Sequence, residues 1–279
     1  MNYLHGFHAG NHADVLKHAA LMALLAYLKS KEKPLFVLDS HGGRGGYDLS
    51  APEALRSGEY RQGIARLVGA ADAPAALKPY LTAIEAANPG GGLSFYPGSP
   101  LLIARALRVQ DRLIACDLHP GEAEILKETL YPWPRARVEA RDGYGALKAL
   151  LPPPERRGLV LIDPPFEKKT EFADLAEGLR QAWKRFPGGV YLVWYPLKDR
   201  AGASAFLAAV AAAGMRDATS YELFVRDPEA GPGMAGSGLL ALNASFALDP
   251  VMAEIGPWLA ARLAQGEGAR FTKSRLTPE

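Results

Sequence analysis

Short apolar runs alternate with helical stretches along the second half of this chain, and this alternation limits the fold more than any other feature. The runs are RLIACDLH, ARVEARD, GLVLIDPPF and GVYLVWYP, and each is followed by residues with apolar groups at helical spacing. An earlier run of the same kind is LFVLD. Strands that alternate with helices form mainly parallel sheets with helices on both faces. The pattern therefore predicts a Rossmann-like, doubly wound α/β fold.

Two further apolar runs, ATSYELFV and GLLALNASF, raise the expected number of strands to seven. The loop between them is too short to hold a crossover helix, so we expect this last pair to be antiparallel. Residues 48–92 instead carry helical periodicity and proline breaks without a strand pattern, which predicts a small helical insertion. We therefore expect one domain over residues 1–279, with an N-terminal flap and helix over 1–29 and an inserted helical subdomain over 48–92.

The composition is that of an ordinary globular protein, with 48% hydrophobic and 22% charged residues. The net charge of +2 permits a nucleic-acid partner without arguing for one. The single cysteine, Cys116, cannot form an intramolecular disulfide and fits a reducing cytoplasm. The longest early apolar run, AALMALLAYL, is too short to cross a bilayer, and no signal-peptide pattern precedes it. We expect a cytoplasmic protein with no membrane contact.

Acidic residues follow four of the expected parallel strands, namely Asp39, Asp117, Asp142 and Asp163. In open α/β sheets, ligands bind at the carboxyl ends of the strands, so these acids mark one rim of a site. A glycine-rich loop after Asp39 allows the backbone to approach a nucleotide closely. The next acidic strand end, Asp117, lies too far downstream for a nicotinamide site, but its carboxylate suits the two hydroxyls of a ribose.

The sequence DPPF, at residues 163–166, indicates chemistry on an amino group. The exocyclic amine of a nucleobase is a poor nucleophile because its lone pair is delocalised into the ring. The Asp163 carboxylate and the backbone carbonyl of Pro164 can accept its two N–H groups and draw it towards tetrahedral geometry. The prolines stiffen the turn, and Phe166 offers a face on which an unpaired or flipped base can stack. These are the marks of an S-adenosylmethionine-dependent methyltransferase.

The motif itself does not separate adenine from cytosine, RNA from DNA, or a base from a glutamine amide. A DNA adenine or cytosine N-methyltransferase remains open, although the insertion is short for a target-recognition segment. A non-catalytic RNA-binding assembly factor with the same fold is a third reading, and the intact DPPF motif argues against it.

The motifs FHAGNHADVLKH, LDSHGG, YPGSPLLIAR, RDG, LIDPPF and VWYP follow one another along the chain. With these motifs, essentially the whole chain resembles the RlmJ family, class I methyltransferases of large-subunit ribosomal RNA. It implies N6-methylation of one adenine, adenine 2030, in 23S ribosomal RNA. It further implies S-adenosylmethionine as cofactor and, as partner, RNA that is protein-free or in early assembly. We expect a monomer without a metal.

The resemblance also implies the site residues. Asp163 would be the catalytic residue, and the cofactor would be held by His18, His41, Ser99, Asp117, Asp142, Gly143 and Asp163. The substrate would contact Tyr3, Lys17, Pro164 and Phe166. Two positions depart from the family pattern: Phe166 stands where the family commonly has Tyr, and Asp117 where a Glu is familiar. We also expect Ser99 to be the N-cap of the helix that follows it.

Four of the six histidines, His5, His8, His12 and His18, lie within HGFHAGNHADVLKH. By the resemblance, His18 faces the cofactor and this segment orders over the bound base as a flap. Hydrogen bonding and capping within the segment is an equal alternative for the other three. His8 and His12 have the i, i+4 spacing of a zinc site, but no cysteine lies nearby.

Weaker candidates are aromatic or basic. The VWYP run offers Trp194 or Tyr195 to the pocket, although a strand-end aromatic is more often part of the core. Basic residues that could contact phosphates are Arg56, Arg61, Arg66, Lys168 and Lys169.

Overall fold

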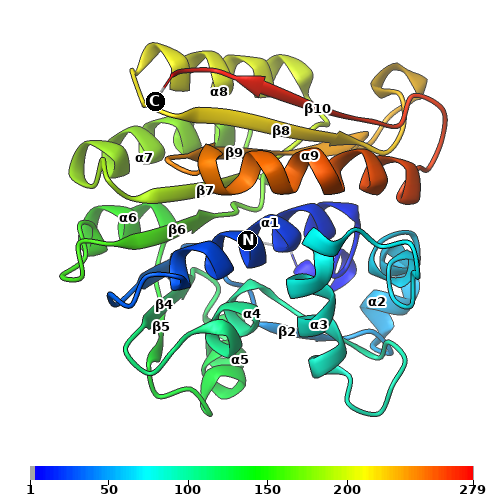
Figure 1. The fold of residues 1–279 in the computed structure, drawn as a ribbon, viewed down its shortest axis with the longest axis horizontal. Coiled ribbons are helices and arrows are strands. Elements are labelled where there is room, and N and C mark those ends of the chain that lie inside the picture. Colours follow the sequence, from blue (N-terminus) through cyan, green and yellow to red (C-terminus); the bar gives the residue numbers. More distant parts are fainter. Residues whose placement is uncertain (1–3, 279) are drawn as a thin grey trace.

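The computed structural model describes residues 4–278, and an eight-stranded sheet runs through its middle in the order β10-β8-β9-β7-β6-β1-β4-β5 (Figure 1). The strands are β1 (Phe36–Asp39), β4 (Arg112–Asp117), β5 (Ala136–Ala140), β6 (Gly158–Ile162), β7 (Val190–Pro196), β8 (Ala218–Phe224), β9 (Gly236–Leu242) and β10 (Arg270–Arg275). The five strands β5, β4, β1, β6 and β7 pair in parallel. The mainly parallel, doubly wound sheet expected from the sequence is confirmed.

The other part of the sheet is antiparallel. Strand β9 lies between β7 and β8 and pairs with both, so the expected antiparallel pair is confirmed. The expected count of seven strands is one short, because β10 adds to the outer edge of β8. Its sequence, RFTKSR, lacks the apolar run of a buried strand because it forms a solvent-exposed edge.

Helices cover both faces of the sheet (Figure 1). The helices on one face are α1 (His12–Lys29), α4 (Ser99–Ala106), α5 (Pro120–Leu130) and α9 (Ser245–Arg262). Their apolar residues form one buried cluster with residues of the sheet. The opposite layer consists of α6 (Gly143–Leu150), α7 (Glu171–Arg185) and α8 (Arg200–Ala212). None of the helices in the described range 4–278 is long and apolar enough to span a membrane.

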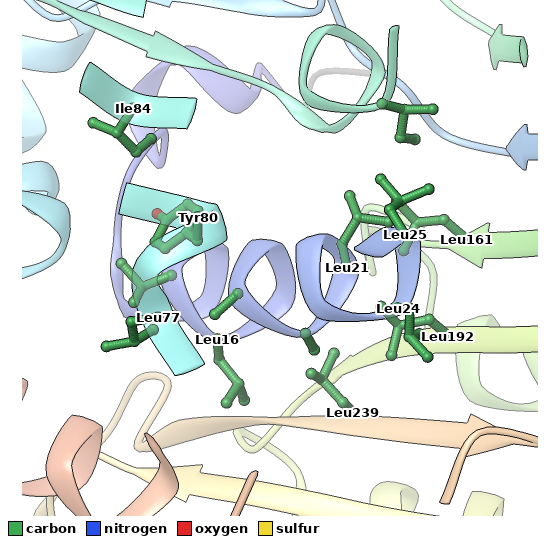
Figure 2. Close-up of a cluster of buried hydrophobic side chains, with 14 of the residues drawn as sticks. Leu16, Leu21, Leu24, Leu25, Leu77, Tyr80, Ile84, Leu161, Leu192 and Leu239 are labelled. Carbon is green, nitrogen blue, oxygen red and sulfur yellow. The ribbon is translucent and has the colours of Figure 1, made fainter. Parts of the chain in front are cut away.

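Helix α1 is buried along most of its length. Figure 2 shows its leucines, among them Leu16, Leu21 and Leu24, with side chains of the sheet on one side and of α3 (Lys78–Ala87) on the other. The sheet residues in this cluster include Leu161, Leu192 and Leu239. Polar residues of the same helix are therefore buried with the apolar ones, and they reach the carboxyl ends of the parallel strands.

The segment between β1 and α4 is mostly helical. A short antiparallel ribbon of β2 (Gly46–Asp48) and β3 (Phe95–Pro97) joins its two ends. Between these strands lie α2 (Pro52–Ser57), α3 and the 3₁₀ turns η2 (Glu59–Gln62), η3 (Ile64–Arg66) and η4 (Ala75–Leu77). The turn η2 packs next to the segment that precedes α1, where Glu59 meets His8 and Asn11.

Candidate active site

A cavity of about 590 Å³ opens at the carboxyl ends of the parallel strands, between them and the N-terminal part of α1. All the predicted site residues that the structure describes line it: Lys17, His18, His41, Ser99, Asp117, Asp142, Gly143, Asp163, Pro164 and Phe166. Tyr3 lies outside the described residues. The strand ends and the N-terminal motif, far apart in sequence, thus share one cavity.

Backbone amides hold two of the strand-end carboxylates. Asp117 ends β4, and its oxygens accept the N–H groups of Gly43 (3.0 Å) and His119 (2.7 Å). Burial raises the pKa of Asp117, and these two hydrogen bonds oppose that rise. Asp142 precedes α6 and caps it, because Oδ2 accepts the N–H of Gly145 at 2.6 Å. Both carboxylates are fixed by the strand-to-turn geometry of the fold.

Gly143 is required by close packing. A Cβ at this position would overlap the carbonyl oxygen of Ser40 and lie 2.5 Å from Cε1 of His41. The backbone at the start of α6 therefore lies directly against the loop after β1. Any larger residue would displace one of the two segments that line the cavity.

The end of β1 contributes buried groups as well. Asp39 is fully buried, and this burial raises its pKa to about 7, with Ser99 opposing the rise and the negative Asp163 adding to it. Burial also lowers the pKa of His41 to about 4, so its imidazole is neutral near pH 7. Ser99 is the first residue of α4 rather than its N-cap, which is Gly98, so that expectation is wrong by one position. Its side chain turns inward and is 6% exposed.

The Asp163 carboxylate is held from the other side of the cavity. Its Oδ2 lies 2.5 Å from Nζ of Lys17, one turn into α1, and the Asp163 side chain is only 14% exposed. The same ammonium lies 2.9 Å from Oδ1 of Asp14. No residue within the described range 4–278 is seen to donate to Oδ1 of Asp163, so this oxygen is available to a ligand.

The rest of the DPPF turn forms an aromatic corner. Phe166 has a φ of 50°, which is unusual for a residue with a side chain. Its ring meets Trp194 edge-on at 5.7 Å and Phe172 at 4.8 Å. Pro164, Phe166 and Trp194 line the same cavity as Asp163. The corner therefore places aromatic faces and the Asp163 carboxylate on one cavity.

The four N-terminal histidines have separate environments. His5 Nε2 lies 2.9 Å from Asp14, and His8 Nδ1 lies 3.0 Å from Glu59. His12 is buried, and burial lowers its pKa to about 4. His18 contacts the Tyr96 hydroxyl at 2.7 Å through Nδ1, and burial lowers its pKa to about 3.

No zinc cluster forms from these rings. Within residues 4–278 no group of three or more His, Cys, Asp or Glu side chains is arranged to hold a metal ion. His8 and His12 have i, i+4 spacing, but His8 lies before α1 begins, and its ring turns to Glu59.

The weaker candidate residues have different environments in the structure. Trp194 lines the cavity, whereas Tyr195 is fully buried and donates to Glu222 at 3.1 Å. Arg66 donates to the carbonyls of Arg262 and Ala264, which gives its guanidinium a structural role.

Sequence reasoning missed Asp14, which lies on α1 with its side chain 1% exposed. An Asp and a Lys three residues apart usually mark a solvated helix face. The apolar run that follows was the only sign that this helix is buried on all sides.

The cavity fits a nucleoside-bearing cofactor. Its volume is within the usual range for small-molecule sites. Asp117 can accept ribose hydroxyls, and Gly143 permits the close approach of a backbone. His18 Nε2 is buried and finds no hydrogen-bond partner among the described residues, so it is a polar atom that a ligand would satisfy.

Comparisons with known proteins agree with this geometry. The model of the family described as "Ribosomal RNA large subunit methyltransferase D, RlmJ" matches residues 32–275. Two curated proteins named "Ribosomal RNA large subunit methyltransferase J", from Escherichia coli (strain K12) and Haemophilus influenzae, are each 41% identical over the full length of both chains. A crystal structure of a Legionella pneumophila protein has a TM-score of 0.87 and 36% identity, covering 96% of this chain and 98% of that one.

Proposed function

The chain belongs to the RlmJ family of large-subunit ribosomal RNA methyltransferases, and from this premise we propose that it methylates N6 of one adenine in 23S ribosomal RNA with S-adenosylmethionine. The family's target, adenine 2030, is the proposed position. The observation that carries the proposal is the Asp163-Pro164-Pro165-Phe166 turn, which lines the same cavity as the carboxylates after β4 and β5.

The proposed cofactor residues are His18, His41, Ser99, Asp117, Asp142, Gly143 and Asp163. When bound, S-adenosylmethionine supplies an electrophilic sulfonium methyl group. Asp117 would accept the ribose hydroxyls, and Asp142, before α6, would accept the amine of the cofactor's adenine. Ser99 would bind near the methionine end, and His18 would face the cofactor.

Asp163 is the proposed catalytic residue. The Lys17 ammonium holds Oδ2, which leaves Oδ1 to accept one N–H of the target amine. The carbonyl of Pro164 accepts the other, and the two acceptors together pull the nitrogen out of conjugation with the ring. Phe166 stacks on the base, and the edge-on contact with Trp194 holds the Phe166 ring in place. The residues that line the cavity would keep competing water away from the amine.

The RNA reaches the cavity past two segments. We propose that residues 1–29, including Tyr3, form a flap and helix over the target base, and that the insertion over 48–92 supports this flap. The contacts between His8 and Asn11 and Glu59 of η2 support this pairing. In this reading a single domain, acting as a monomer in the cytoplasm and without a metal, carries the whole reaction.

The test is methyl transfer from labelled S-adenosylmethionine to protein-free 23S ribosomal RNA, with duplex DNA alongside and the modified nucleoside identified by mass spectrometry. We expect N6-methyladenosine at one RNA position, and none with Asp163→Ala. Label on DNA alone would contradict the RNA substrate. Label on cytosine would contradict the target base. Absence of transfer while the cofactor still binds would indicate a non-catalytic RNA-binding protein.

A further inference from the structure

We propose that Asp14 is a positioning residue for Asp163 and that it acts through the ammonium of Lys17. This inference rests on the proposed function for its effect on the reaction rate. The arrangement of the three side chains, however, can be measured without any RNA.

Asp14 is anchored by groups of the segment that precedes α1. It lies in the first turn of α1, and its Oδ2 accepts the backbone N–H of Gly10 at 2.9 Å and faces His5 Nε2 at 2.9 Å. Its Oδ1 lies 2.9 Å from Nζ of Lys17. The carboxylate is thus fixed to the turn before the helix, and it fixes the ammonium in turn.

Lys17 lies between two carboxylates of different origin. Its side chain is 5% exposed, and Nζ contacts Asp14 on its own helix and Asp163 in the loop after β6. A buried ammonium paired with one carboxylate can turn around it, whereas two carboxylates on separate elements fix its position. Asp14 therefore determines where Lys17 places Oδ2 of Asp163, and so where Oδ1 points.

The charge of Lys17 depends on the same pair. Burial opposes the ammonium, but Asp14 first and Asp163 second outweigh it, so the pKa of Lys17 lies above its ordinary value. Other titratable groups face this cluster from the neighbouring elements: His5 and His8 before α1, His12 and His18 on α1, Asp39 and His41 at the end of β1, Tyr80 on α3 and Tyr96 on β3. None of these replaces Asp14 as a direct partner of the ammonium. Removing the Asp14 charge should lower the pH at which Lys17 loses its proton.

The first test is a double-mutant cycle on kcat with Asp14→Asn and Lys17→Met in the full chain. We expect Asp14→Asn to lower kcat by about 10- to 100-fold, as small misplacements of reacting groups do. The KM values for RNA and cofactor should change little. In the Lys17→Met background, Asp14→Asn should cause no further loss, because its partner is absent. Additive losses, or an unchanged kcat in folded Asp14→Asn, would overturn the proposal.

Asp111→Asn is the matched control for the loss of a buried carboxylate. Asp111 is fully buried and paired with Arg108, but it lies before β4, at the amino end of the strands. This variant should lose stability and keep kcat. Thermal unfolding and cofactor binding of every variant establish that it is folded. If Asp111→Asn lowered kcat as much as Asp14→Asn, the loss would be structural and the proposal would be wrong.

The second test is the titration of the Lys17 ammonium by ¹⁵N NMR, with Lys17→Met for assignment. We expect the ammonium signal to persist to higher pH in the unsubstituted protein than in Asp14→Asn. The kcat of Asp14→Asn should then fall as the pH rises, over a range where the unsubstituted protein stays constant. Equal titration in both proteins would overturn the proposal. If neither the unsubstituted protein nor any variant methylates RNA, the proposed function fails. The titration would still show whether Asp14 controls the charge of Lys17.

Discussion

The cavity has two walls that are built in different ways. The strand-end wall consists of Asp117, Asp142 and Gly143, where backbone amides hold the carboxylates. The helix wall consists of Asp14, Lys17 and His18 on α1, where buried side chains hold one another. Asp163 belongs to a strand end by sequence but is held by the helix wall through Lys17.

This difference explains how the site combines fixed and adjustable parts. Carboxylates bound to backbone amides keep their positions as long as the sheet is folded. Charged groups that depend on each other change together when one of them is removed or titrated. The strand-end wall therefore suits binding of a nucleoside, and the helix wall suits control of Asp163, the proposed catalytic carboxylate.

The largest expected effect comes from substituting Asp163, where the two walls meet. Asp163→Asn keeps the shape of the side chain and removes the charge that we propose accepts the amine. We expect the single-turnover rate of methyl transfer to fall by about 10²- to 10⁴-fold, the usual range for a positioned acid or base. Thermal unfolding should show that the variant is folded. An unchanged rate would remove Asp163 from the reaction.

His12, on the same helix as Asp14 and Lys17, tests the burial of this helix through its response to acid. Its pKa is about 4 in the folded protein, against 6.5 when exposed, because burial disfavours the charged ring. Its contribution to stability is therefore complete above pH 6.5 and is lost as the pH falls towards 4. We expect His12→Gln to lose less unfolding free energy than the unsubstituted protein over that interval, by up to about 3 kcal/mol. If chemical unfolding showed the same change of unfolding free energy with pH in both proteins, this prediction would be contradicted.

Gly143→Ala tests the strand-end wall. The added Cβ overlaps the carbonyl of Ser40, so α6 or the loop after β1 must shift, at a cost of about 1–3 kcal/mol. We expect this cost to appear as weaker cofactor binding in calorimetry. Gly188→Ala is the matched control, since its added methyl group meets no atom within 4 Å. Equal affinities of the two variants would show that the Gly143 contact does not shape the site.

Phe166, in the aromatic corner with Phe172 and Trp194, separates the contribution of stacking from that of polar contacts. Replacing it with Leu should weaken RNA binding by about 1–3 kcal/mol, the usual value of stacking one base on an aromatic ring. Phe166→Tyr keeps the ring and should bind RNA as the unsubstituted protein does. Binding measured with a short target RNA checks both. A Leu variant with full affinity would place the base elsewhere.

The smallest expected effect is at His8, at the outer edge of the helix wall. Its hydrogen bond to Glu59 raises its pKa, so the stabilisation is present below pH 6.5 and is lost as the pH rises through the folded value. Both side chains are well exposed, 40% and 38%, so solvent screening limits the effect to below about 1 kcal/mol. His8→Gln should lower the unfolding free energy at pH 5.5 only slightly, and not at all at pH 8.5. A larger loss of unfolding free energy at pH 8.5 than at pH 5.5 would contradict the expected direction of this pH dependence.

The two walls also differ in how far the sequence predicts them. The acids of the strand-end wall follow from the alternation of strands and helices, because parallel strands end at one edge of a sheet. Strand β10 is not predicted in this way, because an edge strand with charged residues has no apolar pattern. The DPPF turn was recognisable because its residue types, in that order, match one kind of chemistry.

The helix wall was only partly predictable. Lys17 and His18 were assigned through the family resemblance, but the spacing of Asp14 and Lys17 is that of an exposed ion pair. Their burial depends on α3 and on β6, β7 and β9, which pack around α1 from distant parts of the chain. No local pattern records such packing. The same holds for the contact of His8 with Glu59, which joins residues 51 positions apart.

The most direct test of the central claim is a crystal structure with S-adenosylhomocysteine and adenosine monophosphate bound together. We expect the nucleoside of the first ligand to lie along Asp117, Asp142 and Gly143. We expect the base of the second ligand to stack on Phe166, with its amino nitrogen within hydrogen-bond distance of Asp163 Oδ1 and the Pro164 carbonyl. An amino group turned away from Asp163, or a base bound outside this corner with the cofactor product in place, would contradict it.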